Sequence, residues 1–266
     1  MDDLTLASTM KRLVVWLDQA WQPPAFVSTQ YNGPPFGRCY VSVDPARQHQ
    51  QASANWNRVH LCGAETGLQP EGLHRLIEQF KAAGVKRFFV WLSPGPDMDT
   101  LRGWLGQTGF TRRTWTRYPT LVRAPLEPSA FRTDLIIREA RAGDLAAAHK
   151  AVGETMWGEY ERSFGKEGFT HFMAFDGARP VAVAALAVFE GLGYLTTAVT
   201  AEGDRGRGAH SALIAARIAK ARELGCATLA VETLTLLERS LRNLERAGFR
   251  VAYEKEVYEW SAESSG

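Results

Sequence analysis

The chain has 266 residues, 45% of them hydrophobic, which is enough for two domains of ordinary size. Its 31 basic and 29 acidic residues leave a net charge of +2, so we expect neither a nucleic acid nor an anionic membrane as a partner. The three cysteines lack the spacing of a disulfide framework or zinc site, and no apolar run is long enough to span a membrane, so we expect a soluble, cytoplasmic protein without a metal.

The first half of the chain reads as short elements divided by glycine and proline. Ser8 or Thr9 can cap a helix that runs to about Trp21, and apolar residues at helical spacing predict a second helix closed by Gly84. Apolar and β-branched runs predict the strands. The expected elements are a helix to residue 21, strands at 25–31, 37–43 and 55–62, a helix at 70–83, a strand at 85–92, a helix at 98–105 and a β segment at 111–122.

The second half follows a linker marked by Pro125 and Pro128. Asp176-Gly177 lies between two apolar runs, which is a strong signal for a tight hairpin. The expected elements are a strand at 133–139, a helix at 144–152, a less regular helical stretch to 164, strands at 169–175, 180–189 and 193–200, a helix at 208–224, a strand at 226–232, a helix at 238–247 and a last strand or hairpin at 250–260.

The two halves repeat one order of elements. In each, a helix closed by glycine precedes a strand, a short helix, a Gly-Phe pair and a β tail. The offset is 141 residues from Gly84 to Gly225 and 139 residues from Gly109 to Gly248. An internal duplication of about 140 residues is the simplest explanation.

The stretch from Ala201 to Leu213 predicts a strand, a glycine loop and a helix in succession. Gly206 and Gly208 let backbone N–H groups turn toward a ligand at the positive end of the helix, so the loop can hold an anion. Arg205 and Arg207 add positive charge, which suits a pyrophosphate. The loop sequence matches neither the lysine-containing phosphate-loop motif of nucleoside triphosphatases nor the dinucleotide-binding G-x-G-x-x-G motif.

The segment Arg205-Gly-Arg-Gly208-Ala-His210 resembles the R-x-x-G-x-G/A loop of the GNAT superfamily of acyl-CoA-dependent N-acyltransferases, whose loop amides hold the pyrophosphate of coenzyme A. His210 departs from the glycine or alanine usual at the sixth position. The order of elements from Thr133 to Trp260 matches that of family members. The resemblance implies an α/β (α+β) fold of two tandem GNAT-like domains, each with a mixed, mostly antiparallel sheet flanked by helices.

The resemblance also implies different roles for residues 1–128 and residues 129–266. In the first half, the place of the arginine loop reads Ala64-Glu-Thr-Gly-Leu-Gln69, where an acidic residue would repel a pyrophosphate. We therefore expect a degenerate domain at 1–128, structural or substrate-shaping, and a catalytic acyl-CoA-binding domain at 129–266.

Candidate site residues follow from the family pattern. The strand before the loop is expected to meet the acyl and pantetheine groups with its backbone, and Glu232 and Glu190, at strand ends, are candidates for the general base. The tyrosine that often protonates the coenzyme A thiolate is replaced by Leu244, which leaves Ser240, a water or an unassisted thiolate. The expected cofactor-binding residues are Ala198, Val199, Arg205, Gly206, Arg207, Gly208, Ala209, His210, Ser211 and Asn243.

The resemblance therefore implies an N-acetyltransferase that moves an acetyl or other acyl group from acyl-CoA directly to an amine. The acceptor is a small-molecule amine or a protein amine, and the protein is expected to be a monomer or homodimer. The alternative is a non-catalytic acyl-CoA-binding or regulatory module with the same fold, which the leucine at position 244 favours.

Overall fold

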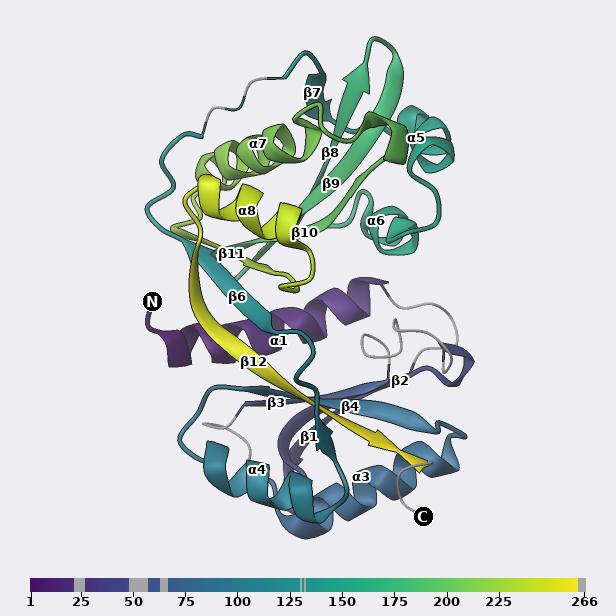
Figure 1. Ribbon diagram of the computed structural model, residues 1–266, viewed down its shortest axis with the longest axis vertical. Coiled ribbons are helices and arrows are strands. Elements are labelled where there is room, and N and C mark those ends of the chain that lie inside the picture. Colours follow the sequence, from purple (N-terminus) through teal and green to yellow (C-terminus); the bar gives the residue numbers. More distant parts are fainter. Residues whose placement is uncertain (22–26, 48–56, 63–66, 130, 132, 263–266) are drawn as a thin grey trace. The chain divides into compact units, whose positions relative to one another are not determined.

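The computed structural model describes residues 1–21, 27–47, 57–62, 67–129, 131 and 133–262 (Figure 1). The chain forms two compact units. Unit 1 comprises Met1–Tyr118 and Tyr253–Gly266, and unit 2 comprises Pro119–Ala252. Each unit has a mixed, mostly antiparallel sheet flanked by helices, which confirms the expected α/β class.

Unit 1 is built on the sheet order β1-β2-β3-β4-β12, with β5 paired to β12. Its neighbouring strands are antiparallel except β3 and β4, which are parallel and joined by α3. Alternate residues of the strands and the apolar stripe of α3 form one core, which includes Leu73, Phe80 and Phe88. The elements are α1 (Asp3–Trp21), β1 (Val27–Gly33), β2 (Gly37–Val43), η1 (Pro45–Arg47), β3 (Arg58–Cys62), α3 (Pro70–Ala82), β4 (Arg87–Ser93), α4 (Met98–Gln107), β5 (Thr111–Arg112) and the unit 1 part of β12 (Arg250–Ser261).

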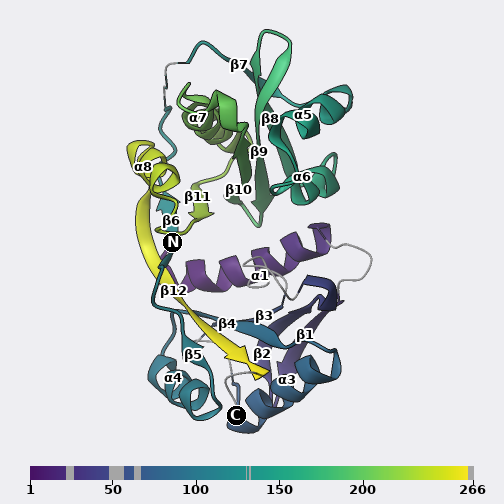
Figure 2. The same ribbon diagram turned by 45° about the vertical axis from the view of Figure 1, so that its right-hand side comes forward.

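Unit 2 repeats this topology with the order β6-β11-β10-β9-β8-β7. Here β10 and β11 form the parallel pair, joined by α7, and the other neighbours are antiparallel. Figure 2 shows α7 and α8 on one face of this sheet and α5 and α6 on the other, each pair over its own core. The elements are β6 (Tyr118–Arg123), β7 (Ile136–Glu139), η2 (Ala142–Asp144), α5 (Leu145–Val152), α6 (Trp157–Ser163), β8 (Phe169–Asp176), β9 (Arg179–Phe189), β10 (Leu192–Thr200), η3 (Glu202–Asp204), α7 (Ala209–Glu223), β11 (Thr228–Glu232) and α8 (Glu238–Arg246).

Most expected elements are present, and the first helix starts earlier than expected. Asp2 accepts a hydrogen bond from the backbone N–H of Thr5 at 2.9 Å and so provides the cap. Ser8 and Thr9 lie inside α1, where the Thr9 hydroxyl donates to the Thr5 carbonyl. Pro23 and Pro24, which follow this helix in the sequence, lie outside the described residues.

The closing strands differ most from expectation. The β segment expected at 111–122 is divided into β5 and β6, and β6 pairs with β11 in unit 2 rather than with β4. The last segment is one strand, not a hairpin, and it pairs with β4 in unit 1 through Glu256–Ser261. Each half of the sequence therefore provides the closing strand of the other half's sheet, and the expected division after residue 128 is replaced by a contiguous unit 2 enclosed between two segments of unit 1.

No helix in the described part of the chain combines the length and apolar character needed to cross a membrane.

The exchange of closing strands predicts which fragments fold. Pro119–Ala252 contains β6 and should unfold cooperatively by circular dichroism, whereas the fragment 129–266 lacks it. The loss exposes the side chains that pack around Leu121, which is 0% exposed. Burial of such a side chain contributes about 1.5–3 kcal/mol of a total stability of about 5–15 kcal/mol, so 129–266 should melt at a much lower temperature or show no cooperative transition. Equal melting temperatures for the two fragments would contradict this assignment of β6.

Candidate functional site

The glycine loop leads from the end of β10 to the start of α7. Gly206 has φ of +89° and Gly208, the N-cap of α7, has φ of +82°, a region that side chains other than glycine rarely adopt. No side chain caps the first turn of α7. The amides of Ala209, His210 and Ser211 therefore stay available for an anion at the positive end of a 15-residue helix.

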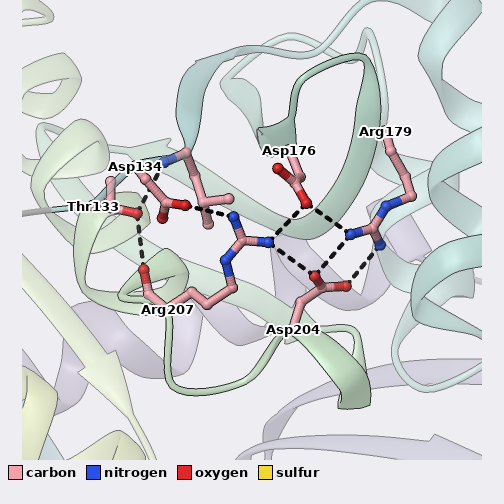
Figure 3. Close-up of polar contacts among 7 residues, drawn as sticks. Thr133, Asp134, Asp176, Arg179, Asp204 and Arg207 are labelled. Carbon is pink, nitrogen blue, oxygen red and sulfur yellow. Dashed lines mark hydrogen bonds and ion pairs between the residues drawn. The ribbon is translucent and has the colours of Figure 1, made fainter.

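Arg207 is held by carboxylates of its own unit (Figure 3). Its guanidinium lies 2.6 Å from Asp134, 2.8 Å from Asp176 and 3.3 Å from Asp204. Arg179 binds the last two aspartates as well, at 3.0 and 2.8 Å. The side chain that was expected to contact a pyrophosphate is thus used to hold the loop, and a ligand would meet the backbone of Arg207 rather than an uncommitted charge.

Arg205 is placed differently from its neighbour. Its side chain is 58% exposed, and its acidic contact is Glu202 at 3.8 Å, a distance at which a surface ion pair contributes little. Of the two arginines in the loop, Arg205 is therefore the one whose side chain is available to bind an anionic ligand.

His210 and Asn243 form a polar pair between α7 and α8. The Asn243 side-chain amide donates to Nδ1 of His210 at 3.1 Å, which leaves the ring proton on Nε2. Burial, and then the charge of Arg217, lowers the pKa of His210 to about 4, so the ring is neutral at pH 7. The histidine that replaces the small sixth residue of the loop thus has a fixed tautomer. Ala209, by contrast, is buried and can offer only its main chain.

The ladder between β10 and β11 ends where β10 is irregular. Parallel pairing stops at Tyr194–Ala230, although β10 continues to Thr200. A β-bulge shifts the register against β9 between Thr196 and Ala198, and the intervening Thr197 has φ of +36°. On its β11 side, the strand beyond Tyr194 thus has backbone groups outside the ladder, including those of Ala198 and Val199.

Glu232 lies beside this break. If the register were continued, it would fall opposite Thr196, and its carboxylate accepts a hydrogen bond from the Thr120 hydroxyl at 3.1 Å. Leu229 and Val231 pack in the core under α7, so alternation places Glu232 on the opposite face. Glu190 lies at the turn before β10, on the order of 20 Å along the strand from Thr196, and is not brought to the break.

The place of a thiolate-protonating tyrosine is apolar. Leu244 is 2% exposed and belongs to the core under α7 and α8. Ser240 lies one turn earlier on α8 and is half-buried.

One buried residue, Arg217, was missed by the sequence analysis. It is 2% exposed and its guanidinium donates to main-chain carbonyls, two of them at the bulge. The signal was a cation at a core-facing position, four residues after Leu213 and one before Ile218. Leu224, the last residue of the helix expected at 208–224, is 48% exposed. Among the described residues, no cluster of three metal-ligating side chains is found.

Comparisons with known proteins identify a family match in the second half and similar folds. Residues 137–249 match the family described as Acetyltransferase (GNAT) family. A GCN5-related N-acetyltransferase from Kribbella flavida is 17% identical, with a TM-score of 0.65 over 97% of this chain and 95% of that chain. A tandem GNAT protein from the clavulanic acid biosynthesis pathway is 10% identical, with a TM-score of 0.66 over 94% of this chain and 87% of that chain. No curated protein matches. The structural matches therefore show the fold alone.

The contacts of Arg207 predict an acid-dependent stability. Hydrogen bonds from Arg207 lower the pKa of Asp134 and Asp176, and one from Arg179 lowers that of Asp204. A lowered pKa in the folded state adds stability above the ordinary value of 3.8, and this stability is lost as the pH falls below it. Arg207→Gln should therefore lower the melting temperature at pH 7 and reduce its further fall between about pH 5 and about pH 2.

Arg205→Gln is the matched control, because it removes an arginine from the same loop without breaking these contacts. Its melting temperature should follow the wild-type pH dependence. If Arg207→Gln also follows it, the carboxylates do not stabilise the loop through Arg207.

Proposed function

Because residues 137–249 match the GNAT family of acetyltransferases, we propose that this chain is an N-acyltransferase that moves an acyl group, acetyl above all, directly from acyl-CoA to an amine. One observation carries the proposal. The β10–β11 ladder opens at Tyr194, and the strand that diverges leads directly into a glycine loop at an uncapped helix N-terminus. An extended ligand with an anionic end can lie along the open backbone and place its pyrophosphate on the loop amides.

The proposed cofactor seat uses mostly main-chain groups. The N–H groups from Gly206 to Ser211 would bind the pyrophosphate, with Arg205 as the contributing charge. Arg207 would act by holding the loop in position against Asp134 and Asp176. Backbone groups of Ala198 and Val199 would meet the pantetheine and acyl groups.

Glu232 is the proposed general base. The amine nitrogen forms a bond to the acyl carbon, the carbon–sulfur bond breaks with its electron pair remaining on sulfur, and the amine proton passes to the carboxylate, directly or through one water. Glu232 is suited to this role because it lies at the break, on the face away from α7. An acceptor amine would approach from that face.

The second candidate function is a module that binds acyl-CoA without turnover. The buried Leu244 favours it, because it leaves no acidic hydroxyl where the family resemblance implies one for sulfur. If the chain is an active enzyme, its acceptor is a small-molecule amine or a protein amine. Identifying this acceptor would show whether the first half has a structural or a substrate-shaping role. A degenerate first half, structural or substrate-shaping, remains our proposal. Its acidic loop, at Ala64 to Thr66, lies outside the described residues.

Turnover separates the two candidates. Purified full-length protein with acetyl-CoA and a panel of small amines, aminoglycosides and peptides should release free coenzyme A thiol for at least one acceptor, and calorimetry should show acetyl-CoA binding. Binding without thiol release for any amine would support the module. A failure to bind acetyl-CoA would refute both.

Glu232→Gln should lower kcat/KM by about 10²-fold or more, because it removes the proton acceptor while leaving a side chain of similar size. The acetyl-CoA dissociation constant should stay within about twofold, since the cofactor seat is unchanged. Glu190→Gln is the matched control and should retain wild-type kinetics. Full activity in Glu232→Gln would exclude this residue as the base.

Arg205→Ala should weaken acetyl-CoA binding by about tenfold, the effect of losing one charge-assisted contact at the surface. Arg222→Ala, at the exposed far end of α7, removes the same charge away from the loop and should leave the dissociation constant unchanged. Calorimetric titration of both variants gives the comparison. Equal affinities would mean that the loop holds the cofactor without Arg205.

A further inference from the structure

Arg217 is a fully buried cation that pairs with carbonyls instead of a carboxylate. Its Nε–H donates to the Leu213 carbonyl at 3.0 Å, and Nη1 donates to the carbonyls of Ala185 and Thr196, each at 3.2 Å. Burial lowers its pKa to about 9, so it is still protonated at pH 7. Within the described residues it has no ion pair. A buried charge of this kind is costly, which makes its position informative.

The guanidinium lies at the irregularity of β10. Ala185 and Thr196 are the last register pair before the bulge, and pairing resumes at Ala184 and Ala198. A bulge interrupts the hydrogen-bond ladder locally, and here Arg217 donates to a carbonyl on each of the two strands. The side chain therefore holds the strands in the arrangement from which the open part of β10 departs.

Arg217 and Glu232 reach this place from opposite faces of the sheet. Arg217 comes from α7, the helix whose first turn forms the anion seat, and Glu232 projects from the other face. A thioester placed at the break would thus have a carboxylate on the side of the incoming amine and a cation on the side of the cofactor.

The hydrogen-bond partners of Arg217 are neutral carbonyls, so no carboxylate among them compensates its positive charge. At this place β9 and β10 contribute the carbonyls of Ala185 and Thr196. On α7, His210 lies two turns earlier and is neutral. The three hydrogen bonds engage Nε and Nη1, so the two N–H groups of Nη2 lie outside them.

We propose that Arg217 is a positioning residue that holds the β10 bulge and provides the fixed positive charge for the departing coenzyme A thiolate, in place of a protonating tyrosine. The inference rests on the proposed function. When the carbon–sulfur bond breaks, sulfur keeps the electron pair and the amine proton goes to Glu232. The cation stabilises the resulting thiolate until it takes a proton from solvent. A preorganised charge in a site of low dielectric is effective for this task because nothing must reorient when the negative charge forms.

Coenzyme A bound to the wild-type chain tests the inference without an acceptor. The ultraviolet absorbance of the thiolate, followed against pH at saturating protein, should show the bound thiol ionising at a pH about one unit or more below that of free coenzyme A. Titration at the same pH as the free thiol, with binding verified by calorimetry, would overturn the inference and leave the proposed function standing. Absence of coenzyme A binding would overturn both.

Variants separate the charge from the architecture. Arg217→Met should return the titration of the bound thiol to that of free coenzyme A, measured at saturating protein, and lower kcat by about tenfold or more. Arg217→Lys keeps the charge and should recover part of the titration shift. Arg222→Met, on the exposed side of the same helix, is the control and should match wild type. If Arg217→Met fails to fold, the wild-type titration and Arg217→Lys decide the matter. A shifted titration that persists in a folded Arg217→Met protein would refute the role of its charge.

Discussion

The interruption of β10 determines the geometry of unit 2. A strand that pairs on both sides uses its backbone donors and acceptors in the sheet, and no ligand can compete for them. Here the ladder to β11 stops after Tyr194, and a bulge at Thr197 shifts the register against β9. The chain beyond this point leads to the glycine loop. The anion seat, the open backbone and the acidic strand end all depend on this single departure from regular pairing.

The unusual conformation is supported by polar side chains instead of by apolar packing alone. Arg217 donates to carbonyls at the bulge, and Arg207 ties the glycine loop to the hairpin turn at Asp176 and to Asp134. Both side chains are arginines, whose planar group can satisfy several acceptors at once. The loop and the strand before it are therefore held in place in the absence of a ligand, which reduces the entropy that binding must overcome.

Local patterns predicted what depends on local chemistry. Helical spacing identified α3 and α7, Asp176-Gly177 identified the hairpin of β8 and β9, and Gly206 and Gly208 identified the loop before α7, where the structure gives both glycines a positive φ. The ion pairs of Arg207 could not be predicted in this way. Asp134 is 73 residues distant in sequence, and only the folded chain brings it next to Arg207. Arg217 could have been noticed, since a cation interrupts the core-facing stripe, but its acceptors exist only because of the bulge.

The partner of each closing strand was also beyond local reasoning. Both tails are β segments that contain apolar residues, and the two halves have the same order of elements, so the pattern alone allows either tail to complete either sheet. Tyr258 and Trp260 pack in the core of unit 1, and Leu121 packs in the core of unit 2. A preference of this kind depends on how well side chains fill two similar cores, which pattern alone does not show.

This crossed arrangement has a consequence for synthesis on the ribosome. Unit 2 is contiguous, so all of its residues have been translated once Ala252 is added, whereas unit 1, which starts first, needs Tyr253–Ser261 for its sheet. The sheet of unit 1 therefore stays incomplete, with the edge of β4 unpaired, while the residues of unit 2 are translated. Unpaired strand edges invite aggregation, so this interval is the time when the nascent protein is most exposed to misassembly.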